Sequence, residues 1–174
     1  MPDQGAISTA YVLFEMAGTT YAVPSENVLH LEMVERITPV PDTYPYVEGV
    51  FFSRGLILPA INLRIRFGLE RIDYGLSTRL IVTRIGERIV GFIVDSAREF
   101  LTIAPETIIP PPEEMSEISG NYISGVARMG ERLVLMLDLA EVIKPAEAAG
   151  LPPSRDQDGT TPPGTRATSP GEST

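Results

Sequence analysis

Two stretches of this chain, 76 residues apart, repeat one local pattern. YVEGV at residues 46–50 matches YISGV at residues 122–126, and Asn-Leu at residues 62–63 matches Asp-Leu at residues 138–139. Similar segments at a fixed spacing are typical of a duplicated unit. A mostly β unit of about 70 residues that occurs twice predicts two small β-barrels packed together.

Short runs rich in Val, Ile, Tyr and Phe occur in pairs, and a tight turn with glycine separates the two runs of each pair. Such runs favour strands, and glycine supplies the positive φ that tight hairpin turns need. The pattern predicts four hairpins, with turns at residues 17–18, 54–55, 86–87 and 130–131. It also predicts three short helices, at residues 25–29 with Ser25 as N-cap, at residues 62–67 and at residues 138–143.

The composition changes near Lys144 of the 174 residues. Residues 145–174 contain no aromatic residue and are rich in Pro, Gly, Ser and Thr, so they bury too little apolar surface to offset the entropy of ordering. We expect a disordered tail there, a flexible N-terminus at residues 1–8, and a folded core at residues 9–144. Within the core we place two lobes at roughly residues 20–75 and 76–135, with an exchange of terminal elements possible. The lobes should share a substantial hydrophobic contact, because half-length barrels bury little core alone.

The charge balance and residue types exclude several classes of protein. A net charge of −9 argues against nucleic acid and against an anionic membrane surface as partners. The absence of cysteine excludes disulfides and zinc–thiolate sites, and a single histidine, His30, excludes a multi-histidine metal site. No metal or other cofactor is expected. The sequence contains no run of about 18 apolar residues, so we expect no membrane helix. The N-terminus lacks the pattern of a signal peptide. We therefore expect a cytoplasmic protein.

Few residues suggest catalysis. Asp95 and Asp138 each end an apolar strand, but acids at strand ends usually cap turns or helices. His30 has no nucleophile motif to accompany it. Arg54 follows an apolar strand at a turn, where an interface contact and an ordinary solvated side chain are equally compatible with the pattern. The adjacent Phe51 and Phe52 must face opposite ways in a strand, so one points outward. The residues therefore favour a two-lobed β interaction module over an enzyme.

The chain resembles the CheW family, the adaptors of bacterial chemotaxis arrays. The resemblance covers about residues 10–144 and depends on the order and spacing of several segments together. These segments are YVLF and YAV in the opening hairpin, ITPVP leading to YVEGV, RGLILPAINLR, VGFIVD and RLVLMLD.

This resemblance implies two SH3-like barrels, no catalysis and no direct membrane insertion. It implies two partners, the cytoplasmic tip of chemoreceptors and the CheW-like regulatory domain of a CheA-like histidine kinase, and so a cytoplasmic place at membrane-bound receptor arrays. The receptor-contacting arginine of the family falls on Arg54. A contacting valine on the helix after the first hairpin falls on Val28, and His30 replaces an acidic residue two positions on. Phe52 and Ser53 replace the Asn and Leu before the arginine. Kinase contacts cannot be placed on particular residues.

Other functions stay open at this point. The cleft between the lobes could bind a small ligand, as a double barrel with a pocket would. The departures at His30, Phe52 and Ser53 are compatible with an adaptor paralogue of a pilus-type or other signalling system. A hydrolase would have to use Asp95, Asp138 or His30, and an SH3-like nucleic-acid binder would have to overcome the acidic balance.

Overall fold

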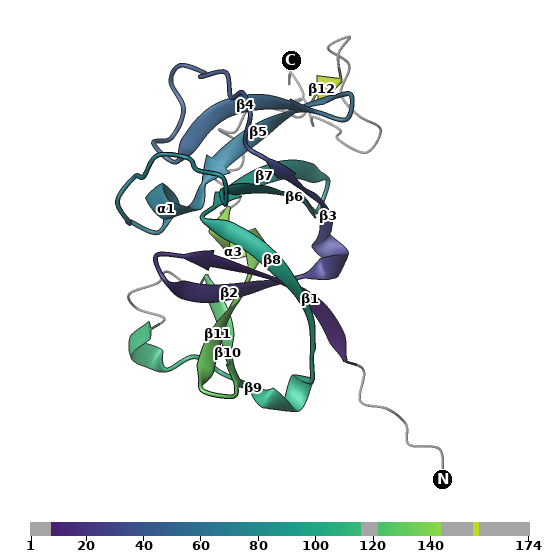
Figure 1. Ribbon diagram of the computed structural model, residues 1–174, viewed down its shortest axis with the longest axis vertical. Coiled ribbons are helices and arrows are strands. Elements are labelled where there is room, and N and C mark those ends of the chain that lie inside the picture. The colour runs from purple at the N-terminus through teal and green to yellow at the C-terminus, as the bar shows by residue number, and fades with distance from the viewer. Residues whose placement is uncertain (1–7, 116–121, 144–154, 157–174) are drawn as a thin grey trace, which may run out of the picture.

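The computed structural model describes residues 8–115, 122–143 and 155–156. In this part of the chain the fold is mostly β with short helices, as predicted, and the strands form two sheets that lie one above the other (Figure 1). Apart from Ser8 and residues 155–156, the predicted flexible N-terminus and disordered tail lie outside the described residues.

The strands of each sheet come from several parts of the chain. The lower sheet of Figure 1 has the order β8-β1-β2-β11-β10-β9, with the bounds β1 Thr9–Met16, β2 Thr19–Pro24, β8 Ser96–Ile103, β9 Ile108–Ile109, β10 Ile123–Met129 and β11 Arg132–Leu137. The upper sheet has the order β12-β5-β7-β6-β3, with β4 on the other side of β5, and the bounds β3 Val28–Met33, β4 Val47–Ser53, β5 Leu56–Asn62, β6 Arg79–Ile85, β7 Arg88–Val94 and β12 Arg155–Asp156.

Both sheets close on themselves. In the lower sheet the two outer strands, β8 and β9, follow one another in the chain through the 3₁₀ helix Pro105–Thr107. In the upper sheet Thr38, which follows β3, exchanges two backbone hydrogen bonds of 2.8 Å with Val50 of β4. A sheet whose first and last strands meet forms a barrel. The predicted pair of small β-barrels is confirmed.

Each barrel combines strands from both repeats. The opening hairpin β1–β2 joins the lower barrel through a parallel pairing of residues 20–22 with residues 134–136 of β11. The hairpin β6–β7 joins the upper barrel in the same way, through residues 91–93 and residues 60–62 of β5. Each repeat therefore contributes its first hairpin to the barrel of the other repeat, and neither barrel can close from one half of the chain.

The repeat is visible in individual hydrogen bonds. The backbone N–H of Asn62 donates to the carbonyl of Tyr46 at 2.8 Å, and that of Asp138 donates to Tyr122, also at 2.8 Å. The side chains of Asn62 and Asp138 then accept N–H groups of the following turn, which satisfies backbone donors that a helix start leaves unpaired. These caps begin the two four-residue helices α1 (Leu63–Arg66) and α3 (Leu139–Val142), as predicted.

The third predicted helix is different from the expectation. Ser25–Asn27 is a 3₁₀ helix that follows Pro24, and no side chain makes a capping hydrogen bond there. Val28 already belongs to β3, where it pairs with Thr83 of β6. The prediction of Ser25 as N-cap is wrong, because strand pairing with β6 takes over the residues after Asn27.

The largest hydrophobic cluster lies between the two barrels. It has 18 buried residues among those described, which include Phe14 and Val23 from the lower sheet and Ile61 and Phe92 from the upper sheet. Two smaller clusters each lie within one barrel. The predicted hydrophobic contact between the lobes is confirmed, and it is larger than the separate core of either barrel.

Arg66 of α1 lies between equivalent residues of the two repeats. Its guanidinium carbon is 5.0 Å from the centre of the Tyr46 ring and 4.7 Å from the centre of the Tyr122 ring. Its Nε donates a hydrogen bond of 2.8 Å to the carbonyl of Val142 in α3. Cation–π contacts of this kind stabilise a desolvated arginine. One side chain thus connects the two halves of the duplication.

Close packing inside the upper barrel depends on Gly91 of β7. A Cβ atom at this position would lie 2.5 Å from Cζ of Phe51, whose side chain fills the barrel, and 3.0 Å from Cδ2 of Leu80. Glycine is therefore required at position 91 by the small space beside Phe51 and not by the backbone angles. Phe51 is the inward member of the Phe51–Phe52 pair.

We predict that Gly91→Ala destabilises the protein by about 2 kcal/mol, because the added methyl group overpacks a closed barrel. The measurement is the free energy of unfolding in urea. Gly75→Ala is the matched control, since a Cβ there meets no atom within 4 Å. Equal stability of the two variants would show that the barrel interior can rearrange around the methyl group.

Candidate interaction surface

The turn between β4 and β5 presents two side chains to solvent. Arg54 and Gly55 both have positive φ, of 47° and 84°, which is the conformation of a two-residue hairpin turn that matches the twist of the strands. The Arg54 side chain makes no hydrogen bond or ion pair among the described residues. Phe52 is 56% exposed, whereas the neighbouring Phe51 is buried. The hairpin therefore presents a cation and an aromatic ring close together at the surface.

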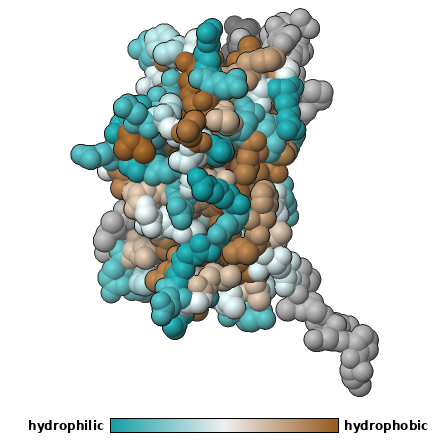
Figure 2. All heavy atoms as spheres, in the orientation of Figure 1, coloured by the Kyte–Doolittle hydropathy of each residue, from teal (hydrophilic) through white to brown (hydrophobic). Residues whose placement is uncertain are grey.

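A groove of about 590 Å³ runs beside this turn, between β4 and the segment that includes the end of β3. Its apolar walls include Met33, Phe51 and Ile57, and its charged side chains are Glu32, Glu35, Arg36 and Arg54. Exposed apolar groups on the face of the molecule in Figure 2 form separate small groups among hydrophilic ones and not one broad patch. The groove can therefore receive a partner that offers both apolar and charged side chains.

His30, Glu32 and Ser53 form a polar cluster at the groove, which Glu32 and Ser53 help to line. His30 Nε2 lies 2.8 Å from Glu32 Oε2 and 3.0 Å from Ser53 Oγ, and the Ser53 hydroxyl donates to Glu32 Oε2 at 2.6 Å. Ser53 is buried. In a hydrolase triad the histidine lies between the serine and the acid and uses a different ring nitrogen for each. Here one nitrogen meets both groups and the serine donates directly to the acid, so the cluster joins β3 to β4 in an arrangement different from that of a hydrolase triad.

The structure brings together four of the five residues that the resemblance marked as receptor contacts. Phe52 and Arg54 are exposed, and Ser53 and His30 lie beneath them in the polar cluster. Val28 is in strand β3 and not on a helix, and its half-buried side chain packs against the core between the barrels. Which of these residues touch a partner stays a prediction.

Sequence reasoning missed the groove residues contributed by β3 and the segment after it, which include Glu32, Met33 and Arg36. They lie about 20 residues before Arg54 in the chain. The pairing of Thr38 with Val50 and the contacts of His30 and Glu32 with Ser53 bring this segment beside β4. The one available signal was Met33, a large apolar residue at the end of a strand, which is 51% exposed.

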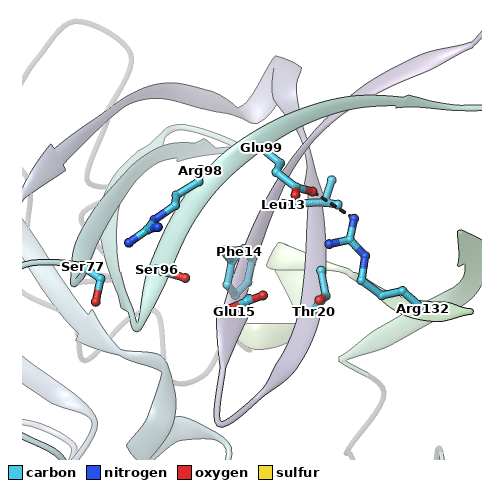
Figure 3. Close-up of a pocket in the computed structure, with 9 residues that line it drawn as sticks. All are labelled: Leu13, Phe14, Glu15, Thr20, Ser77, Ser96, Arg98, Glu99 and Arg132. Atoms are coloured by element: carbon cyan, nitrogen blue, oxygen red, sulfur yellow. Dashed lines mark hydrogen bonds and ion pairs between the residues drawn. The ribbon is translucent and has the colours of Figure 1, made fainter.

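A second hollow, of about 310 Å³, lies beside the paired strands β1 and β8 of the lower barrel (Figure 3). Arg132 makes a 2.9 Å ion pair with Glu99 at one side, and Arg98 points towards Ser77 and Ser96 at the other. None of the residues predicted as receptor contacts lines this hollow.

Asp95 joins three parts of the chain. Its Oδ1 and Oδ2 accept hydrogen bonds of 2.7 Å from Nε and Nη2 of Arg64 in α1, and Oδ2 accepts the backbone N–H of Ala17 at 2.9 Å. Partial burial acts to raise the pKa of Asp95, but the hydrogen bonds from Arg64 and Ala17 outweigh it, and the pKa lies below its ordinary value of 3.8. The same hydrogen bond raises the pKa of Arg64. Asp95 is therefore a structural carboxylate, as Asp138 is through its helix cap.

A model of the CheW-like domain matches residues 10–147. The chain belongs to the CheW-like family. Its relatives include the chemotaxis protein CheW of Helicobacter pylori, 35% identical over 134 residues that cover 77% of this chain and 81% of that protein. The chemotaxis protein CheW of Klebsiella aerogenes is 27% identical over 143 residues, covering 82% of this chain and 86% of that protein. Protein FrzA of Myxococcus xanthus is 29% identical over 155 residues, covering 83% and 94%.

A solved structure has the same CheW-like fold. The crystal structure of the scaffolding protein TtCheW from Thermoanaerobacter tengcongensis superposes with a TM-score of 0.74 at 26% identity, covering 81% of this chain and 96% of that one. The resemblance seen in the sequence is thus confirmed, and with it the fold and the assignment to the chemotaxis adaptors. Among the described residues, no helix of this CheW-like protein is long and apolar enough to cross a membrane.

We predict that Asp95→Asn destabilises this CheW-like domain by about 2 kcal/mol at neutral pH, because it removes a charge-assisted pair of hydrogen bonds. The folded-state pKa of Asp95 is lowered, so this stability is present above the unfolded-state pKa and is lost as the pH falls through the folded-state value. The difference in unfolding free energy between the two proteins should be constant from about pH 5 to 8 and shrink below about pH 4.

The control for this prediction is Glu99→Gln, which breaks the exposed ion pair with Arg132 and should cost at most about 1 kcal/mol. A difference between wild type and Asp95→Asn that grows on acidification would contradict the lowered pKa.

Proposed function

We propose that this protein is a non-enzymatic adaptor that couples chemoreceptors to a CheA-type histidine kinase, in a chemotaxis array or a related signalling array. Membership of the CheW-like family and the likeness to a protein described as scaffolding support an adaptor. The observation that carries the receptor half of the proposal is the β4–β5 turn, which presents Arg54 and Phe52 beside a groove of mixed character.

In this proposal Arg54 and Phe52 contact the receptor, and the groove beside them receives one face of a receptor helix. Helix-in-groove recognition needs apolar walls for the anchor residues and charged rims for orientation. Arginine and aromatic side chains supply much of the binding energy at such interfaces. His30 and Ser53 keep the turn rigid through Glu32, which lowers the entropy lost on binding. Val28 acts at the junction of the barrels.

The non-enzymatic part is supported by what the candidate catalytic side chains do. Asp95 is saturated by Arg64 and Ala17, Asp138 caps α3, and His30 shares one nitrogen between Glu32 and Ser53. Each group has a structural partner, and the three lie in different places in the fold. No metal or cofactor has a part in the proposal.

The partners proposed are the cytoplasmic tip of a chemoreceptor and the CheW-like regulatory domain of a CheA-like kinase. A protein with these partners works in the cytoplasm, beside membrane-bound receptors and without inserting in the membrane. The net charge of −9 agrees with protein partners and not with nucleic acid or anionic lipid.

We predict that Arg54→Glu weakens binding to a purified receptor-tip fragment from the same organism about tenfold or more, because it reverses the charge of an exposed anchor. Isothermal titration would measure the Kd. Arg128→Glu is the matched control, since Arg128 is exposed on the β10–β11 hairpin, the equivalent of the β4–β5 hairpin in the other repeat. The control should bind the receptor as wild type does.

The kinase gives a second readout of the same variant. If Arg54→Glu still binds the regulatory domain of the kinase while losing the receptor, the receptor surface is placed correctly. Equal receptor binding by wild type and Arg54→Glu would remove Arg54 from the surface. Failure of wild type to bind either partner, together with a melting temperature raised by a small ligand, would favour the ligand-binding double barrel instead.

A further inference from the structure

The upper barrel has an edge that the closed sheet leaves unpaired. Strand β5 pairs with β4 along its whole length on one side. On its other side the parallel strand β7 reaches only residues 60–62, which leaves Leu56 and Ile57 outside the barrel pairing. An unpaired strand edge presents free backbone N–H and C=O groups that can bind another strand.

A segment from far along the chain occupies this edge. Strand β12 pairs antiparallel with β5, with Arg155 opposite Ile57 and Asp156 opposite Leu56 (Figure 1). The chain between Ile143 and Arg155 has 11 residues, which span at most roughly 40 Å.

The occupied edge is part of the candidate interaction surface. Ile57, which pairs with Arg155, also lines the groove. Leu56 pairs with Ser53 and so closes the turn that presents Arg54. A strand added at residues 56–57 therefore lies directly beside the proposed receptor contacts.

The equivalent edge of the lower barrel shows the uncovered state. In β11 the parallel pairing with β2 begins at Val134, so Arg132 and Leu133 correspond to Leu56 and Ile57. No described strand pairs with them on that side, and Leu133 is 57% exposed, whereas Ile57 is only partly exposed. The two repeats thus offer the same strand edge. In the upper barrel β12 covers it, and in the lower barrel no described strand does.

We propose that the segment at Arg155–Asp156 is an internal strand that docks on the β5 edge and competes with partners that bind at the Arg54 surface. The competition rests on the proposed receptor function, whereas the docking does not. Docking by strand addition uses the main chain, so it tolerates varied side chains. When an internal strand occupies a site part of the time, the apparent affinity for a partner is the intrinsic affinity multiplied by the fraction of sites that are free.

The test uses the full chain with the double substitution Arg155→Pro and Asp156→Pro. Neighbouring residues of a strand point their N–H groups to opposite sides, so one of the two prolines removes the donor that faces β5. The double substitution of the same residues by alanine is the matched control, because it removes both side chains and keeps both N–H groups. Leu56 pairs with Ser53 across the turn, so its N–H faces β4 and that of Ile57 faces the open edge. Hydrogen exchange at the amide of Ile57 therefore measures the docking, with Leu133 as the internal reference.

We expect faster exchange at Ile57 in the proline variant only, with no change at Leu133. We also expect the proline variant to bind the receptor-tip fragment about three- to tenfold more tightly than wild type, with the alanine variant like wild type. Equal exchange in all three proteins would overturn the docking. Faster exchange with unchanged receptor affinity would overturn the competition. If no protein binds the receptor, the proposed function fails, and the exchange data still decide the docking.

Discussion

The exchange of hairpins between the two repeats is the constraint on which the rest of this fold depends. Two short parallel pairings, β2 with β11 and β5 with β7, place the first hairpin of each repeat in the barrel of the other. The strands that meet in each barrel are therefore far apart in the chain. The hydrophobic cluster between the barrels contains more of the described buried residues than the cluster inside either one. Such a protein should unfold as one cooperative unit, because opening one barrel removes strands from both repeats.

This arrangement also explains why the interaction surface is rigid. The β4–β5 turn is held from beneath by the His30–Glu32–Ser53 cluster, and its strands are part of a closed barrel. Closure needs the approach of Thr38 to Val50 and the small volume of Gly91. A surface built on such a framework can present Arg54 and Phe52 without ordering a loop on binding, which leaves more of the contact energy for affinity.

Much of the fold could be predicted because its signals are local. The four hairpins follow from glycine turns between β-branched runs, and the caps at Asn62 and Asp138 from single side chains. The shared core followed from the repeat. The helix predicted at residues 25–29 is present only as the 3₁₀ helix Ser25–Asn27 and lacks the predicted cap, because Val28 and the residues after it pair as β3 with β6, Arg79–Ile85. The groove could be predicted only in part, since Arg54 and Phe52 are visible at a turn but the β3 side depends on long-range pairing.

Arg66 lies at a point where equivalent residues of the two repeats meet. Tyr46 and Tyr122 are equivalent residues, and the guanidinium between them contacts both rings. The residue equivalent to Arg66 is Val142, whose carbonyl accepts the hydrogen bond from Arg66. Two arginines could not occupy this one space, and their like charges would repel there. At such a point the two copies of the repeat need different residues. A fused duplication can have them, whereas a symmetric dimer of one half-sized chain cannot.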